Sequence, residues 1–284
     1  MLLYRFFSLK STAELCYYSY MILTIDTGGT KTLVSSFGLN GRKGSSIKFP
    51  TPHDPDEYVT QLKATVRAHY SAEDVSVIVL AIPGVIDNGI VKWCGNLPWS
   101  HIDFGKRLKD LLPGVPVYIE NDAKLAGLGE TRSLPSIPVS SLYVTISTGI
   151  GAGLTVNGQL DKGLRFSEIG HIPLEYRGKV MIWEKFASGR AIVKIYHKFA
   201  RDIKSPRVWR RIATRMSRGF LVVIPTIQPD IIIIGGSVGT YFDRYGHFLI
   251  EILQKHLPPH IECPKIVQAT HPEEAVIYGC YYYA

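Results

Sequence analysis

The chain has 284 residues, of which 46% are hydrophobic and 20% are charged, values typical of a globular protein with a large core in one or two domains. No stretch approaches the roughly 18 to 20 consecutive apolar residues that a membrane-spanning helix needs, so we expect no membrane association. The net charge is +8, and much of the excess lies at Lys198, Arg201, Lys204, Arg207, Arg210, Arg211, Arg215 and Arg218.

The first twenty residues lack the basic start, the continuous apolar middle and the small-residue cleavage site of a signal peptide. We expect the domain to begin at Met21, with residues 1–20 as a loosely attached extension or the product of a misassigned start. The four cysteines are far apart in the sequence, which excludes a CxxC redox pair or a local cysteine zinc knuckle. We therefore expect free thiols and a cytoplasmic protein.

The first half of the chain predicts a β-hairpin over residues 22–25 and 32–37, followed by a third strand over 47–49. Apolar residues at helical spacing predict a helix over 55–70. A continuous apolar run over 75–82 is typical of a buried strand. The residues Leu108, Leu111 and Leu112 indicate a short helix, and a strand over 117–119 leads into a helix over 123–130.

The second half repeats this plan. Strands over 142–146 and 152–156 are followed by helical segments around 183–199 and 208–227, a buried strand over 231–234, a helix over 242–256, a strand over 266–268 and a last helix over 273–283. Strands that alternate with helices indicate an α/β fold with mostly parallel crossovers.

Two copies of this plan predict two lobes with a cleft between them. We expect a small N-terminal lobe over residues 21–122 and a larger C-terminal lobe over 123–272. The last helix, about 273–284, could pack back on the first lobe.

Each copy contains a Thr-Gly turn between its first two strands, at Thr27-Gly28-Gly29-Thr30 and at Thr148-Gly149-Ile150-Gly151. Glycine lets backbone N–H groups come close to an anion, and threonine adds a hydroxyl donor. The two turns therefore predict that two lobes hold one polyphosphate between them.

Seven segments, in order along the chain, resemble the motifs of the ROK family (repressor, open reading frame, kinase) of the actin-like ATPase fold. They are Asp26-Thr27-Gly28-Gly29-Thr30-Lys31, Pro83-Gly84, Asn96-Leu97-Pro98-Trp99, Glu120-Asn121-Asp122-Ala123, Ser147-Thr148-Gly149-Ile150-Gly151-Ala152-Gly153, Glu168-Ile169-Gly170-His171 and Gly235-Gly236. The resemblance covers the chain from about Met21 to the C-terminus. It implies a two-lobed fold with a central cleft, and phosphoryl transfer from ATP to a sugar.

The resemblance implies that Asp122 is the general base. A sugar hydroxyl is a weak nucleophile at neutral pH, and a carboxylate can take its proton as it attacks. Without that context, an aspartate after a strand is more often a helix N-cap. The resemblance further implies that the sugar is bound at Asn96, Asn121, Asp122, Glu168, His171 and Glu184. The alternatives are a surface pair for Glu168 and His171, and a helix N-terminal acid for Glu184.

On the nucleotide side, the resemblance implies that Asp26 holds Mg²⁺ through water, because Mg²⁺ keeps several waters and binds few carboxylates. It implies phosphate contacts at Gly28, Gly29, Thr30, Thr148 and Gly149, and adenosine contacts at Gly235 and Gly236. Lys31 either neutralises phosphate or faces solvent.

The sequence departs from the family pattern in three respects, the mildest being Ser147 in the second phosphate loop, where glycine is usual. Residues 172–182 contain no cysteine where family members often carry a zinc motif, so we expect no zinc, and we expect Trp183 and Phe186 to supply rigidity by packing. Twenty residues before Met21 are too few for the winged helix of the family's repressors, so we do not expect a repressor.

The function that these observations favour is an ATP-dependent hexose kinase, a glucokinase that makes glucose 6-phosphate. An N-acetylhexosamine kinase, a fructokinase and a glucokinase that uses inorganic polyphosphate remain alternatives within that class, and a non-catalytic sugar-binding regulator is the alternative outside it.

The basic stretch from Lys198 to Arg218 could be a solvated helix face or could attract a polyanionic substrate. No nucleic-acid recognition motif accompanies it, so we expect no nucleic-acid partner.

The resemblance to the ROK family also suggests a homodimer.

Overall fold

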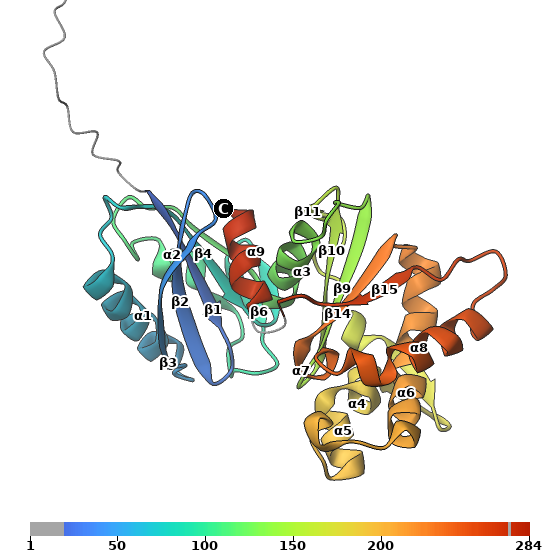
Figure 1. Cartoon of the computed structure of the whole chain (residues 1–284). Helices are drawn as coiled ribbons and strands as arrows, with labels where there is room; N and C mark the ends of the chain where they lie inside the picture. The colour runs from blue at the N-terminus through green and yellow to red at the C-terminus, as the bar shows by residue number, and fades with distance from the viewer. Residues whose placement is uncertain (1–19, 272–273) are drawn as a thin grey trace, which may run out of the picture.

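The computed structural model describes residues 20–271 and 274–284, which form two lobes side by side (Figure 1). The expected N-terminal extension, except for Tyr20, and the expected first residue of the last helix, Glu273, lie outside the described residues. In the part of the chain that is described, no helix is both long enough and apolar enough to cross a membrane.

The first lobe is built on a five-stranded sheet. Its strands are β1 (Met21–Thr27), β2 (Lys31–Gly38), β3 (Lys43–Pro50), β4 (Val75–Ile82) and β8 (Val117–Asn121). They lie in the order β3-β2-β1-β4-β8. Neighbouring strands among β1, β2 and β3 pair antiparallel, whereas β4 is parallel to both β1 and β8.

The second lobe repeats this sheet. Its strands are β9 (Ser140–Ile146), β10 (Ile150–Val156), β11 (Gln159–Leu160), β14 (Ile231–Gly235) and β15 (Lys265–Gln268), in the order β11-β10-β9-β14-β15. The hairpin strands again pair antiparallel and the last two strands are again parallel to the first. The repeat seen in the sequence is therefore a repeat of topology.

The helices predicted from periodicity are confirmed in five cases, within a few residues of the predicted ends. They are α1 (Pro55–His69), α3 (Asp122–Arg132), α6 (Pro206–Ile227), α8 (Phe242–His256) and α9 (Ala275–Tyr283). The predicted helix at Leu108, Leu111 and Leu112 is wrong in extent, because α2 spans Phe104–Leu108. Its N-cap is Asp103, whose side chain accepts a hydrogen bond from Lys106 N at 2.8 Å. Leu111 and Leu112 are buried beyond its end.

Two insertions distinguish the lobes. In the first lobe, β5 (Val85–Asp87), β6 (Ile90–Trp93), β7 (Ile102–Asp103) and α2 lie between β4 and β8. In the second lobe, the insertion lies between β11 and α6 and contains η1 (Ile169–His171), β12 (Pro173–Tyr176), β13 (Lys179–Ile182), α4 (Glu184–Ala187), α5 (Gly189–Tyr196) and η2 (Ala200–Asp202). A short helix outside this insertion, α7 (Gly236–Gly239), follows β14. The sequence predicted none of the strands in these insertions.

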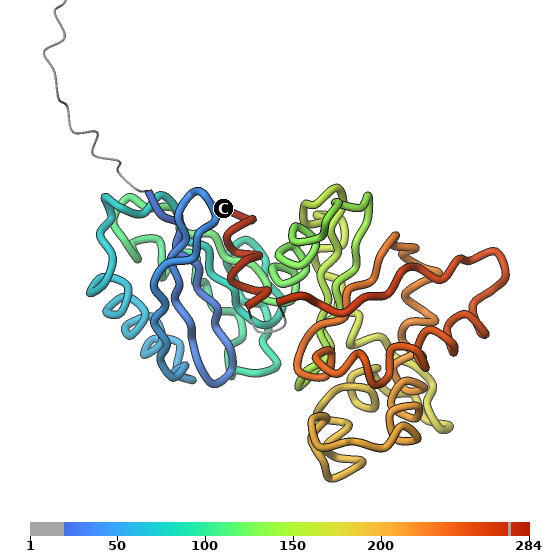
Figure 2. The backbone as a smooth tube through the Cα atoms, viewed as in Figure 1, coloured from blue at the N-terminus to red at the C-terminus, as the bar shows by residue number. Residues whose placement is uncertain are grey.

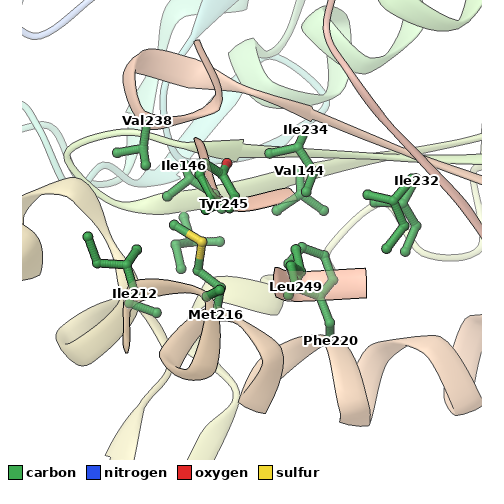
Figure 3. Close-up of a cluster of buried hydrophobic side chains, with 14 of the residues drawn as sticks. Val144, Ile146, Ile212, Met216, Phe220, Ile232, Ile234, Val238, Tyr245 and Leu249 are labelled. Carbon is green, nitrogen blue, oxygen red and sulfur yellow. The ribbon is translucent and has the colours of Figure 1, made fainter. Parts of the chain in front are cut away.

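Both faces of the central strands of each sheet are buried. In β4, Ile78 and Leu80 face the cluster under α1, whereas Val77 and Val79 face the cluster under α9. Because successive side chains of a strand point to opposite faces, such a strand reads as a continuous apolar run. Figure 3 shows the second lobe's core, where side chains of β9 and β14 meet those of α6 and α8.

Two helices join the lobes. Helix α3 follows β8 of the first lobe and packs on β9 and β10 of the second, while α9 follows β15 and packs on β1 and β4 of the first (Figure 2). The two helices also cross each other closely, since a Cβ added at Gly279 would lie 1.7 Å from the Leu125 carbonyl oxygen. On these contacts we propose a lobe boundary at residues 122/123, with α9 belonging to the first lobe.

Candidate active site

The carboxyl ends of the parallel strands of both sheets meet at the junction between the lobes. Asp26, near the end of β1, pairs with Ala81 of the neighbouring strand β4, and Ala81 in turn pairs with Glu120 of β8. In the second sheet, Thr145 of β9 is level with Gly235 of β14. Ligands of open α/β sheets bind outside such ends, because the loops that follow the strands gather there.

A cavity of about 300 Å³ lies at this junction. Eight of the residues predicted as site residues line it: Asn96, Asn121, Asp122, Thr148, Gly149, Glu168, His171 and Glu184. They come from both lobes and from both insertions, so residues spread over 89 positions of sequence (96 to 184) are brought to one cavity.

The remaining predicted residues do not line this cavity. They are Asp26, Gly28, Gly29, Thr30, Lys31, Gly235 and Gly236. The first turn nevertheless touches its wall, because a Cβ added at Gly29 would lie 3.2 Å from the Cβ of Asn96. Gly235 and Gly236 come directly before Ser237 and Val238, which line a second cavity.

Asp122 is the first residue of α3, and Asn121 is the N-cap of that helix. Ala123 N donates to Asp122 Oδ1 at 2.8 Å. Burial is the main cause that raises the pKa of Asp122 to about 6, against the smaller opposing effect of backbone hydrogen bonds. At neutral pH this carboxylate is therefore ionised and still basic enough to accept a proton.

Asn121 is already engaged within the protein. Its Nδ2 donates to the Gly84 carbonyl at 2.8 Å, and its Oδ1 accepts from Lys124 N at 2.9 Å. The capping role that the sequence offered as an alternative for Asp122 thus belongs to Asn121. The amide fixes the turn that presents Asp122, although Asn121 also lines the cavity.

A second carboxylate lies close enough to Asp122 to feel its charge. Burial first, and then the negative charge of Asp122, raise the pKa of Asp26 to about 7, while Lys31 acts in the opposite direction. A divalent cation suits this arrangement, because it would offset the repulsion that the Asp122 charge exerts on Asp26. The donor set therefore fits Mg²⁺ held near Asp26.

Three ionisable side chains of the second insertion form a cluster on the opposite wall. His171 Nδ1 lies 3.7 Å from Glu168 Oε2, and His171 Nε2 lies 3.8 Å from Glu184 Oε2. The turn between Glu168 and His171 is the 3-10 helix η1, so both side chains can face one ligand. Burial raises the pKa of Glu168, with the charges of His171 and Lys124 opposing it.

Glu184 connects this cluster to the second turn. Ile150 N donates to Glu184 Oε2 at 3.4 Å, and a Cβ added at Gly149 would lie 2.6 Å from the same oxygen. Only glycine leaves room for that approach. Glu184 therefore holds the turn expected to bind phosphate beside the residues expected to bind sugar.

Packing supports the insertion where family members often carry zinc. The rings of Tyr176 and Phe186 stack with centroids 4.3 Å apart, and Trp183 N donates to the Ile172 carbonyl at 3.0 Å. Trp183 is fully buried against Phe220 of α6. Over residues 20–271 and 274–284, no group of three or more histidine, cysteine, aspartate or glutamate side chains is placed to hold a metal ion.

The cavity is also lined by residues that the sequence did not single out, among them Trp93, Lys124 and Arg190. The half-exposed ring of Trp93 meets His171 edge to face, with centroids 5.5 Å apart, and so connects the two lobes. Lys124 Nζ lies 3.3 Å from Glu120 Oε1 and also donates to the Arg165 carbonyl. None of these residues stands in a recognisable motif, so only the fold reveals them.

A second cavity, of about 800 Å³, adjoins the first. Its apolar wall consists of Val193, Phe199, Ala200, Val238 and Tyr241. An apolar cavity rimmed by cationic side chains suits the base of a nucleotide and the start of its phosphate chain.

Little of the basic stretch over residues 198–218 faces these cavities. Among its eight cations, Arg201 alone lines either cavity. Arg210 lies 2.8 Å from Glu251 of α8, and Arg215 is buried against the rings of Tyr176 and Tyr196. Most of the stretch therefore belongs to the surface and packing of α6.

Comparisons with known proteins agree with this geometry. A model of the ROK family matches residues 22–284. A Bacillus subtilis (strain 168) protein named "Putative fructokinase" is 31% identical over 237 residues, which is 77% of each chain. An N-acetylmannosamine kinase of Vibrio vulnificus (strain YJ016) is 28% identical over 252 residues, 77% of this chain and 83% of the relative. A glucokinase of Streptomyces coelicolor is 26% identical over 186 residues, 61% of this chain and 58% of the relative.

A solved structure shares the whole architecture. The ROK family glucokinase of Streptomyces griseus, determined in complex with glucose and AMPPNP, superposes with a TM-score of 0.75 over 93% of this chain and 99% of that chain, at 23% identity. The expected two-lobed actin-like ATPase fold is confirmed.

Proposed function

The chain belongs to the ROK family and is a sugar kinase, and from that premise we propose that it transfers the γ-phosphoryl group of ATP to the 6-hydroxyl group of a hexose. The single observation that carries the proposal is the position of Asp122. Its carboxylate lies in a cavity walled by side chains that hydrogen-bond polyols, beside a second cavity suited to a nucleotide.

The cavity's residues divide the chemical work. Asn96, Glu168 and His171 offer donors and acceptors that can orient the hydroxyl groups of a sugar. Asp122 takes the proton of the attacking hydroxyl, and its raised pKa of about 6 places it near the operating pH, where a general base is most effective.

The phosphate side is formed by the two turns. Backbone N–H groups of the two turns bind the phosphate oxygens, apart from that of Gly28, which donates to the Lys31 carbonyl at 2.9 Å. The first turn reaches the cavity wall through Gly29 and Asn96. Asp26 would hold Mg²⁺ through water, and when bound the ion supplies positive charge that offsets the charge of the phosphates.

We favour glucose as the acceptor, as in the glucokinase relative. The relatives named for fructose and N-acetylmannosamine phosphorylation keep fructose and the N-acetylhexosamines as alternatives. ATP is favoured over inorganic polyphosphate as the donor, because the second cavity has an apolar wall and the basic stretch contributes only Arg201 to it.

The test is a steady-state phosphorylation assay with glucose, fructose, mannose, N-acetylglucosamine and N-acetylmannosamine, each with Mg-ATP or polyphosphate. The product's position is assigned by ³¹P NMR. Turnover of a hexose at its 6-hydroxyl supports the proposal and identifies the substrate. If no sugar is phosphorylated by either donor while calorimetry shows sugar binding, the chain is instead a non-catalytic sugar-binding regulator.

A further inference from the structure

The two cavities share one edge. Three residues line both of them: Ser147 and Thr148 of the second turn, and Arg190 of α5. Asp122 lies on one side of this edge, and the apolar wall expected to hold the base lies on the other. A phosphoryl group that moves from nucleotide to sugar must pass this edge.

Arg190 is the one cation among the described residues that faces both cavities. Its side chain is exposed, and over residues 20–271 and 274–284 it has neither a hydrogen bond nor an ion pair. The other arginine on the second cavity, Arg201, is engaged with Asp202 at 3.8 Å. Lys124, on the first cavity, is engaged with Glu120.

The backbone fixes Arg190 relative to the second turn. Gly189 N donates to the Ser147 carbonyl at 2.7 Å, and Ser188 Oγ accepts from Ala191 N at 3.3 Å at the start of α5. The residues on both sides of Arg190 are therefore anchored. Its guanidinium group can reach the shared edge only from a defined position.

Resting on the proposed function, we propose that Arg190 binds the phosphoryl group in transfer. In the reaction, a bond forms between the sugar hydroxyl oxygen and the γ-phosphorus, and the bond from that phosphorus to the β–γ bridging oxygen breaks. The hydroxyl proton goes to Asp122, and ADP leaves with the bond's electron pair. Arg190 donates to the non-bridging oxygens throughout, because a planar guanidinium group matches two phosphate oxygens at once.

The experiment compares Arg190→Ala and Arg190→Lys with the wild type, using the full chain, Mg-ATP and the best hexose from the substrate panel. We expect Arg190→Ala to lower kcat by about 100- to 1,000-fold with the sugar KM nearly unchanged. Arg190→Lys should recover only part of the loss, because lysine cannot bind two oxygens in one plane. Arg211→Ala, which removes an exposed arginine outside both cavities, is the matched control and should keep wild-type kinetics.

A binding measurement makes the test independent of turnover. By calorimetry, Arg190→Ala should weaken ATP binding by about 5- to 10-fold more than ADP binding, because only ATP carries the γ-phosphate. Wild-type kcat in Arg190→Ala, or equal weakening of ATP and ADP binding, would overturn the role of Arg190. If the wild type phosphorylates no sugar, the proposed function fails, and the ATP-to-ADP comparison still decides whether Arg190 contacts the γ-phosphate.

Discussion

The two lobes have the same five-stranded sheet but differ in what is inserted into it. The repeated sheets supply Asp26, Asp122 and the two glycine turns at their carboxyl ends. The insertions supply Trp93 and Asn96 on one side, and Glu168, His171 and Glu184 on the other. We infer that the shared sheets, together with Arg190 of α5, carry the phosphoryl-transfer chemistry, and that the other insertion residues of the cavity carry the choice of sugar.

The largest expected effect comes from a substitution among the residues that the sheets supply. Asp122→Asn keeps the size of the side chain and removes its ability to accept a proton, so kcat should fall by about 100- to 10,000-fold. Steady-state kinetics measure kcat, and calorimetry with glucose measures sugar binding separately. Sugar binding should survive within a few-fold, and Asp110→Asn, an exposed aspartate far from the cavity, is the control.

A change in the insertion should act on binding instead. His171→Ala removes a side chain that we propose contacts the sugar, and it takes away the imidazole that lies between Glu168 and Glu184. We expect the sugar KM to rise about 10- to 100-fold, with a smaller change in kcat. A large loss in kcat with an unchanged sugar KM in His171→Ala would contradict the assignment of His171 to sugar binding.

The pH dependence of kcat/KM tests the role of Asp122 as the general base. Because the pKa of Asp122 is raised to about 6, its base form is lost as the pH falls through that value. We expect kcat/KM to be near its plateau at pH 7.5 and to be about tenfold lower at pH 5, measured with buffers of constant ionic strength. An acid limb that persists unchanged in the residual activity of Asp122→Asn would assign this titration to another group.

The smallest effect is one of stability. The pKa of Asp26 is raised to about 7, so the folded protein binds this proton more tightly than the unfolded chain does between about pH 4 and 7. Stability contributed by the protonated acid is therefore lost as the pH rises through about 7. In the ligand-free protein at pH 8, Asp26→Asn should raise the free energy of unfolding by about 1–2 kcal/mol in a urea titration. An equal gain at pH 5 would show that the effect is not this ionisation.

The sequence predicted the repeated sheets well and the insertions poorly. The strands β4 and β14 are apolar on both faces, and α8 has a strong helical period, so each appears in the sequence as a long uninterrupted signal. In the first insertion, β5 and β7 have only two or three residues, too few to show a period of two, and the edge strand β11 of the second sheet is equally short. Helix α2 was placed too late because its start depends on the cap at Asp103 rather than on its leucines.

The candidate site divides in the same way. Resemblance to the family motifs predicted Asp122, Glu168 and His171 as site residues, and the structure places all three on one cavity. Trp93 and Arg190 stand in no such segment, and they reach the cavity only because β6 and α5 are folded against the lobe junction. The engagement of Asn121 by Gly84 likewise depends on a contact across 37 positions of sequence.

A crystal structure with glucose and a non-hydrolysable ATP analogue would test the central claim most directly. The account predicts that the 6-hydroxyl oxygen of the sugar lies about 2.6–3.2 Å from a carboxylate oxygen of Asp122, with the terminal phosphate of the analogue on the opposite side of that hydroxyl. A sugar bound with its 6-hydroxyl directed away from Asp122, or bound outside this cavity, would contradict it.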